Sequence, residues 1–263
     1  MVPTSLMSNS TSASSEGLKF FTHAELQSLD PRRIPYHLAF IPDGNRRWAK
    51  TQQAPTTRGH REGADILMDI TRACLELGVK VVTFFVFSTE NWSRPDEEVQ
   101  ALMWLFDTYL LMQQPTMIES SIRLQTIGDL SRLPPSLIET IESTKAITKD
   151  CNKIDLVLAM NYGGRDEICR AVQALLDDYT HKRIKREDIN EITIRNYLDT
   201  AQWKDPDLLI RTSGEMRLSN FLLWQTSYTE VFVSDVLWPD FTPQHLLDAV
   251  QNFQKRERRW GGL

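Results

Sequence analysis

Residues 37–50 read HLAFIPDGNRRWAK, and this stretch decides the fold. The apolar run 38–41 predicts a buried parallel strand, and the turn residues 42–45 predict a sharp change of direction directly after it. Residues 46–50 then predict the first turns of a helix. Because a helix start leaves backbone N–H groups free, this junction with two arginines beside it is suited to bind phosphate.

Asp43 is the unusual member of this junction. A carboxylate repels a phosphate group unless a divalent cation lies between the two. We therefore expect a Mg²⁺-diphosphate pocket at the carboxyl end of the strand. The alternative is an Asp-Gly turn followed by a solvated basic helix, which turn statistics favour about equally.

The composition is ordinary for a globular protein: the chain has 263 residues, of which 41% are hydrophobic and 25% charged. The net charge of −5, without an aromatic-basic ladder, argues against a nucleic-acid partner. Residues 45–61 nevertheless contain five Arg or Lys and no carboxylate, so they would attract anions locally. The three cysteines are widely spaced, which supports neither a disulfide framework nor a zinc site and predicts a reducing, cytoplasmic location.

Strand and helix patterns alternate along the whole chain after a Ser/Thr-rich start. We predict a disordered or partly helical N-terminal tail over 1–33, with a short helix capped by Thr22, and one catalytic domain over 34–263. The alternation predicts a single α/β domain, a mainly parallel β-sheet flanked by helices. The predicted strands are 38–41, 79–87, 123–127, 154–160, 208–210 and 231–233, and the predicted helices are 64–77, 97–112, 136–148, 167–179, 182–204 and 242–259.

The predicted helix over 97–112 is apolar on more than one side. Such a helix is usually buried deeply, and this is the favoured interpretation. The alternative is that its second face lines a hydrophobic channel. No apolar run is long enough for a transmembrane helix.

Polar residues follow four predicted strands, in loops 43–47, 88–94, 161–165 and 211–217. The carboxyl ends of parallel strands meet at one edge of a sheet, where ligands gather. Six arginines should converge there, enough for two diphosphates: Arg46, Arg47, Arg58, Arg94, Arg211 and Arg217. The chain has neither a GxxxxGK[ST] loop for nucleotide hydrolysis nor a DDxxD metal motif.

Four ordered motifs resemble the cis-prenyltransferases, and in particular the bacterial undecaprenyl diphosphate synthases. They are DGNRRWA (43–49), FSTENWSRP (87–95), NYGGR (161–165) and LIRTSGE (209–215), and the likeness extends over about residues 35–262. The resemblance implies repeated condensation of isopentenyl diphosphate onto an allylic diphosphate such as farnesyl diphosphate, with cis geometry and Mg²⁺. It also implies a homodimer and a hydrophobic tunnel.

The resemblance assigns roles to particular residues. Asp43 and Glu230 match the metal contacts. The residues matching the allylic diphosphate site are Gly44, Asn45, Arg46, Arg47, Trp48, Thr56, Arg58 and His60. Those matching the catalytic loop are Ser88, Thr89, Glu90, Asn91, Trp92 and Arg94. Those matching the isopentenyl diphosphate site are Arg211, Arg217, Leu218 and Ser219. The tail from Arg258 to Gly262 resembles the segment that reaches the partner subunit's site.

The chain departs from the family pattern at two of these places. Thr56 stands where the family usually has Arg, and nearby Arg58 is a candidate to supply the charge. Met216 stands where many bacterial members have His. Taken alone, Trp48 and Trp92 are better explained by packing, and His60 by an ordinary loop histidine.

The expected product is a polyprenyl diphosphate of the undecaprenyl class, the precursor of a cell-wall lipid carrier. A shorter cis-prenyl product is the alternative, and an inert lipid-binding partner subunit is a rival from another class. A phosphatase is a third interpretation, but no Cys or His nucleophile lies in a phosphate-binding loop of this sequence. Because so apolar a product needs a membrane surface for release, we expect peripheral membrane association. Bulk at Ala101 should shorten the product if that helix face lines the tunnel.

Overall fold

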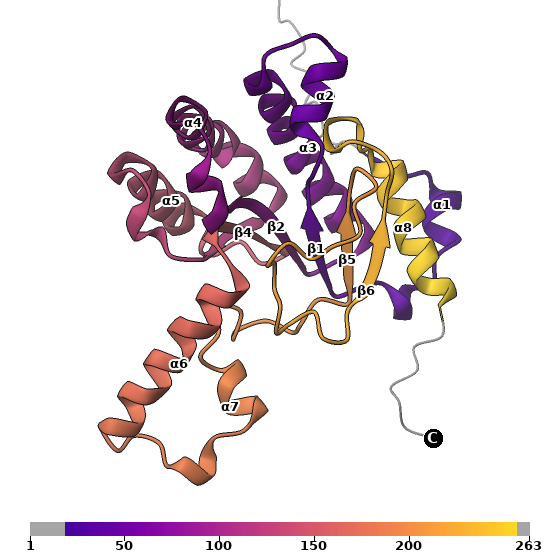
Figure 1. The fold of residues 1–263 in the computed structure, drawn as a ribbon. Helices are drawn as coiled ribbons and strands as arrows, with labels where there is room; N and C mark the ends of the chain where they lie inside the picture. Colours follow the sequence, from indigo (N-terminus) through magenta and orange to yellow (C-terminus); the bar gives the residue numbers. More distant parts are fainter. Residues whose placement is uncertain (1–18, 257–263) are drawn as a thin grey trace, which may run out of the picture.

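The computed structural model describes residues 19–256, and its centre is one parallel sheet of six strands (Figure 1). The strand order is β3-β4-β2-β1-β5-β6, and every neighbouring pair is parallel. The strands are β1 (His37–Ile41), β2 (Val81–Ser88), β3 (Ile122–Ile127), β4 (Ile154–Tyr162), β5 (Leu208–Arg211) and β6 (Glu230–Val233). The predicted fold class is confirmed.

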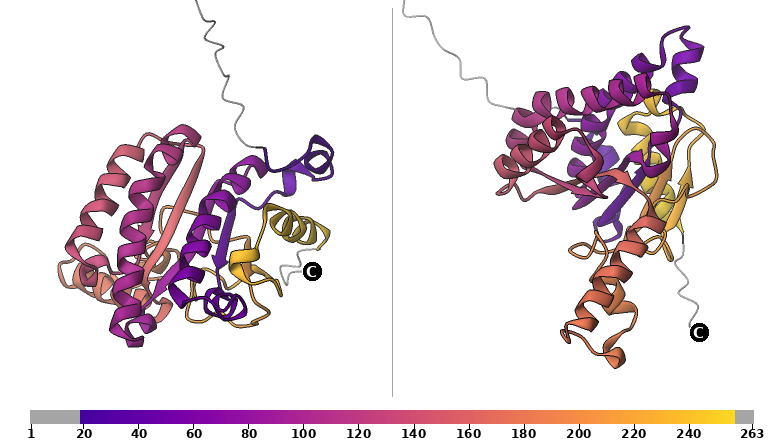
Figure 2. Two further views of the ribbon diagram at one scale, coloured as in Figure 1. Left: turned by 90° about the horizontal axis from the view of Figure 1, so that it is seen from above. Right: turned by 60° about the vertical axis from the view of Figure 1, so that its left-hand side comes forward.

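Helices cover one face of this sheet in a row (Figure 2). The helices are α1 (His23–Gln27), α2 (Asn45–Thr51), α3 (Thr56–Leu77), α4 (Asp96–Ser120), α5 (Pro135–Thr148), α6 (Gly164–Thr180), α7 (Glu191–Arg195) and α8 (Pro243–Lys255). The side chains of α3, α4, α5 and α8 share a core with Leu38 and Phe40 of β1. Helices α6 and α7 project away from the body in Figure 1 and in the right-hand view of Figure 2.

The other face of the sheet is covered by the chain between α7 and β6. There Trp203, Phe221 and Leu222 pack against Ala39 and Ile41 of β1. All five residues of β1 and all nine of β4 are buried, because both faces of the sheet are covered. This explains why the central strands are continuous apolar runs.

Helix α3 begins at Thr56, eight residues before the predicted start. The polar stretch 56–63, expected to be a loop, forms its first two turns. Two glycines in this stretch let α2 pack closely: a Cβ on Gly59 would lie 2.1 Å from the Asn45 carbonyl, and one on Gly63 would lie 2.5 Å from Asn45 Oδ1. Tertiary packing therefore overrides a local sequence that is typical of a loop.

Helix α4 extends eight residues past its predicted end, through Pro115, and is not buried on all sides. Leu102 and Leu110 are buried, whereas the exposed fraction is 68% for Trp104 and 61% for Met112. The favoured interpretation of a deeply buried helix was therefore wrong.

The stretch 182–204 is not one helix but a 3₁₀ turn followed by α7. Helix α1 is capped by Thr22 as predicted, and Phe21 is buried in the core, so residues 19–33 pack on the domain. The predicted disorder of 1–17 and the tail from Arg258 to Gly262 lie outside the described residues.

Candidate active site

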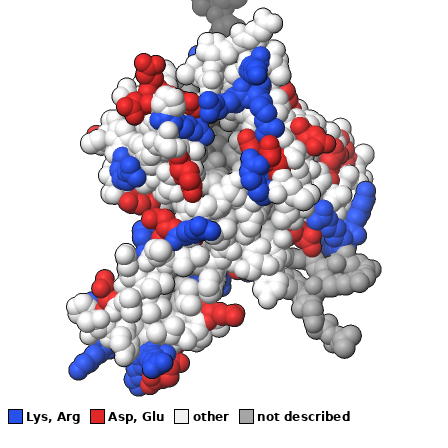
Figure 3. All heavy atoms as spheres, in the orientation of Figure 1, with Lys and Arg blue, Asp and Glu red and all other residues white. Residues whose placement is uncertain are grey.

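A cavity of about 670 Å³ opens at the carboxyl edge of the sheet, between α3, α4 and the strands. The four loops expected to meet lie at this edge, because β4, β2, β1 and β5 are consecutive in the sheet, and three of them line the cavity. The hollow is bordered by charged side chains of both signs (Figure 3). Its mouth is polar, with Asp43, Asn45, His60, Ser88, Asn91, Arg94, Arg211, Arg217 and Ser219.

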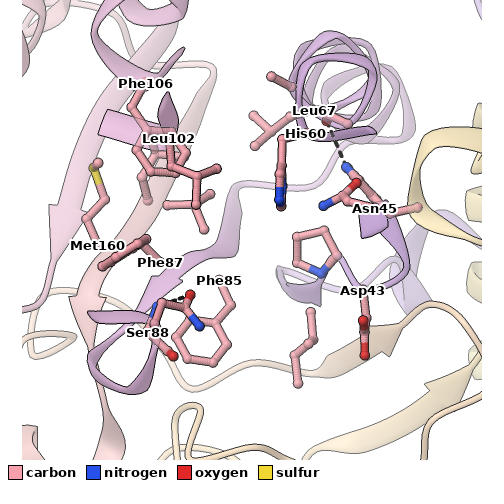
Figure 4. A pocket seen from close by; sticks show the side chains of 18 of the residues that line it. Asp43, Asn45, His60, Leu67, Phe85, Phe87, Ser88, Leu102, Phe106 and Met160 are labelled. Atoms are coloured by element: carbon pink, nitrogen blue, oxygen red, sulfur yellow. Dashed lines mark hydrogen bonds between the residues drawn. The ribbon is translucent and has the colours of Figure 1, made fainter. Parts of the chain in front are cut away.

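The interior of the cavity is apolar. Figure 4 shows Leu102, Phe106 and Met160 gathered on one side of the pocket, with Asp43, Asn45 and His60 on the other. Further apolar lining comes from α3, α4 and β4, with Leu67, Met68, Leu105, Leu110, Met117, Leu156 and Leu158. A charged head and an apolar chain could therefore bind in one continuous space.

Asp43 is held at the mouth by an ion pair with Arg211. Arg211 Nη2 donates to Asp43 Oδ2 at 2.8 Å, and Arg47 Nη2 lies 3.6 Å from Oδ1. Partial burial alone would raise the pKa of Asp43, but the hydrogen bond and charge of Arg211 outweigh burial and lower that pKa. The carboxylate is therefore ionised at neutral pH.

Arg211 organises the loop after β5. Its side chain is almost completely buried, and its Nη1 donates to the Arg217 carbonyl and, at 2.8 Å, to the Ser219 hydroxyl. Arg217, by contrast, has a side chain 59% exposed that pairs with Glu215. The two arginines thus have different environments, although the sequence suggested equal roles.

A second polar cluster joins α3 to α4 across the mouth. His60 Nε2 lies 3.6 Å from Glu98 Oε1, which also accepts from Arg94 Nη1 at 3.1 Å. Burial and the Arg94 charge lower the pKa of His60, and the Glu98 charge only partly opposes them. Glu98 was absent from the predicted site, although its spacing four residues after Arg94 at a helix start was a usable signal.

The loop after β2 lies at the opposite rim of the mouth. The Ser88 N–H donates to Asn91 Oδ1 at 3.0 Å. This bond caps the compact 3₁₀ turn Thr89–Ser93. Both residues and Glu90 line the cavity. Glu90 is fixed in turn by a 2.9 Å bond from Asn220 Nδ2.

A shallower space of about 370 Å³ adjoins the mouth and is lined by the turn after β1. Its walls include Gly44, Asn45, Arg46, Arg47, His60, Arg94 and Arg217. Five of the six arginines expected to converge thus do so. Arg58 does not: it stacks over Trp48 at 5.9 Å and lines a separate groove beside α4.

Several other predicted residues are not among the described side chains that line either space. Trp92 donates to Asn161 Oδ1 at 2.7 Å and lies under Arg132, and Trp48 donates to Asp240 Oδ1 at 2.8 Å. These contacts support the packing interpretation for both tryptophans. The remaining ones are Thr56, the first residue of α3, Thr89, which bonds Glu90, and Leu218, which packs on the opposite face of the sheet.

Glu230 lies away from Asp43 within the chain. It is the first residue of β6, opposite Leu208, the first residue of β5, whereas Asp43 pairs with Arg211 at the far end of β5. Three residues of strand are roughly 10 Å long. Glu230 instead accepts from Arg256 Nη1 at 2.7 Å. Within the chain, Asp43 and Glu230 therefore do not form one metal site.

Asp43 is the carboxylate that lines both spaces, and Glu90 and Glu215 each line one of them. Among residues 19–256, no group of three or more His, Cys, Asp or Glu could hold a metal ion. Mg²⁺ is commonly held by one or two carboxylates together with substrate phosphates. Asp43 and the arginines of the mouth therefore fit Mg²⁺ that binds together with a diphosphate, and do not fit an ion held by protein side chains alone.

Comparisons with known proteins agree with this geometry. The family model for undecaprenyl diphosphate synthases matches residues 41–261. An isoprenyl transferase of Chlamydia pneumoniae is 48% identical over 243 residues, covering 91% of this chain and 97% of that protein. The chain belongs to the isoprenyl transferase family. A second family member, from Clostridium tetani, is 44% identical and covers 89% of this chain and 92% of its own length.

Two solved structures of diphosphate synthases share the fold. Lavandulyl diphosphate synthase from Lavandula x intermedia, in complex with dimethylallyl diphosphate, matches with a TM-score of 0.86 and 35% identity, covering 88% of this chain and all of that one. A probable undecaprenyl diphosphate synthase from Campylobacter jejuni matches with a TM-score of 0.73 and 34% identity, covering 87% of this chain and 99% of that one.

Proposed function

We propose that this transferase condenses isopentenyl diphosphate repeatedly onto an allylic diphosphate, such as farnesyl diphosphate, with cis geometry. The observation that carries the proposal is the single space in which an Arg-rich mouth holding Asp43 leads into an apolar cavity. An undecaprenyl-class diphosphate for the cell-wall lipid carrier is the proposed product.

In this reaction the chain mainly positions and stabilises charge. Arg47 and Arg94 would hold the leaving diphosphate, and Arg217 and Ser219 the isopentenyl diphosphate. Mg²⁺, with Asp43 as its protein ligand, would neutralise the charge that develops on the leaving group. The apolar walls would exclude water from the allylic cation, and the turn that holds Ser88 and Asn91 would lie beside the new bond.

The proposal is tested by incorporation of labelled isopentenyl diphosphate in the presence of farnesyl diphosphate. We expect Mg²⁺-dependent incorporation that EDTA abolishes. A protein that binds both diphosphates but incorporates no label would be the inert partner subunit instead.

A shorter product is the second candidate, because the structure with the higher TM-score is a lavandulyl diphosphate synthase. Side-chain bulk inside the cavity should distinguish the two. We expect Leu110→Trp to shorten the product, since Leu110 lines the cavity. Ala101, expected to serve as this ruler, lines the neighbouring groove beside α4, so Ala101→Trp tests whether that groove holds the product instead.

Chromatography of the dephosphorylated products measures this effect. A shortened product from Ala101→Trp alone would contradict the assignment of the cavity. A short wild-type product would replace the undecaprenyl assignment by the shorter one. Overpacking at Leu110 costs about 1–3 kcal/mol, so the comparison is made below the unfolding transition.

We also propose a homodimer in the cytoplasm with peripheral membrane contact. The projecting helix α6 supports the dimer: Val172, Leu176 and Tyr179 are exposed by 47%, 54% and 48% and lie on one helical face. Of the helices in the described range, none is long and apolar enough to cross a membrane. A monomeric mass in solution would contradict the dimer.

A further inference from the structure

The outward face of α4 carries a line of exposed apolar side chains. They are Trp104, Leu111, Met112 and Ile118, exposed by 68%, 51%, 61% and 50%, and we refer to them as the α4 stripe. Positions 104, 111 and 118 are seven residues apart and share one helical face. Between residues 99 and 118 the helix has a single charged residue, Asp107. A group of exposed apolar side chains on one helix face indicates a binding surface.

A groove of about 340 Å³ connects this stripe to the candidate active site. Trp104 forms part of its wall, and Leu102 and Leu105 line both this groove and the main cavity. The side chains of Leu102 and Leu105 therefore lie between the main cavity and the surface at Trp104. An apolar product leaving between α3 and α4 would emerge beside the stripe.

The same groove has a basic border. Arg58 and Arg61, at the start of α3, line it together with Trp104. They belong to residues 45–61, which carry five Arg or Lys and no carboxylate. The side chains of Arg46 and Arg58 are 62% and 59% exposed. Glu98, which also lines the groove, lies 4.0 Å from Arg46, and Glu62 lies 3.6 Å from Arg58, which leaves Arg61 as the arginine of this border without an ion pair to a described carboxylate. An apolar helix face bordered by Trp and Arg matches the interface of an anionic bilayer.

We propose that the α4 stripe, with Arg58 and Arg61 at its edge, docks on the surface of an anionic lipid bilayer. The proposal rests on the proposed function, in which a long apolar product must pass to a membrane. The basic border and the wall shared with the cavity favour a lipid surface over a second copy of the chain, which would need neither.

The test is flotation of the purified full-length protein with phosphatidylcholine vesicles, with and without 30% phosphatidylglycerol. We expect binding to the anionic vesicles that weakens in high salt. The variant Trp104→Gln/Leu111→Gln/Met112→Gln should lose at least tenfold in partition coefficient. Arg61→Gln should lose about fivefold on anionic vesicles only. The matched control is Ile192→Gln on α7, because Ile192 is exposed by 71% far from the stripe in sequence.

Three results would overturn the proposal: no vesicle binding by the wild type, an equal loss in Ile192→Gln, or an unchanged partition of the triple variant. If the triple substitution instead lowers the molar mass in solution, the stripe is a protein contact and the proposal is wrong. Incorporation of labelled isopentenyl diphosphate in detergent is measured separately. Vesicle binding without incorporation would refute the proposed function and leave the docking surface standing.

Discussion

Asp43→Asn is expected to reduce turnover by roughly 10³-fold or more, and to lower stability less than Asp43→Ala does. The amide keeps the shape of the side chain and can still accept from Arg211 Nη2. It removes the negative charge that a divalent cation requires, and such a cation supplies several kcal/mol of transition-state stabilisation. The measurement is kcat for label incorporation across a Mg²⁺ titration.

Asp240→Asn is the matched control, because Asp240 is also a loop carboxylate but bonds Trp48 outside the cavity. Near-normal kcat for Asp43→Asn in excess Mg²⁺ would refute the metal role. Asp43→Ala is a less suitable variant for this test. It would leave the buried Arg211 guanidinium without its carboxylate, which is destabilising.

Acid titration offers an independent check on this ion pair. Since the folded-state pKa of Asp43 is lowered, Asp43 stabilises the fold above the ordinary aspartate pKa and loses that contribution as the pH falls through the folded value. The free energy of unfolding of Asp43→Asn should therefore decline less steeply in acid than that of the wild type.

Arg217→Ala and Arg211→Ala are expected to have different effects. Arg217 is exposed at the mouth, so its loss should raise KM for isopentenyl diphosphate about tenfold and leave stability unchanged. Arg211 bonds Asp43, the Arg217 carbonyl and Ser219 at once. Its loss should lower kcat, raise KM for both substrates and lower the free energy of unfolding by about 1–3 kcal/mol.

Steady-state kinetics with each substrate varied, together with denaturant unfolding, separate the two variants. Ser219→Ala is a useful intermediate, because it removes one partner of Arg211 without removing the charge. Equal KM changes for both substrates in Arg217→Ala would contradict the division of the mouth into two diphosphate sites.

The sequence by itself determined the sheet and the edge at which the site lies. Buried parallel strands are continuous apolar runs, and turn residues end each run sharply, so β1, β2, β4 and β5 and their loops were predictable. The ordered motifs also predicted the family, which the comparisons confirmed. These features depend on local chemistry that is visible residue by residue.

Only the tertiary structure decided which side chains meet. Residues 56–63, which lie before the predicted helix, form the start of α3, and their glycines let α2 pack closely against it. Strand register placed Glu230 at the far end of β6 from Asp43, and packing turned Arg58 towards Trp48 and away from the cavity. Glu98 came to lie beside His60 of α3, and one face of α4 remained exposed. Each of these outcomes depends on neighbours distant in sequence, which local patterns do not encode.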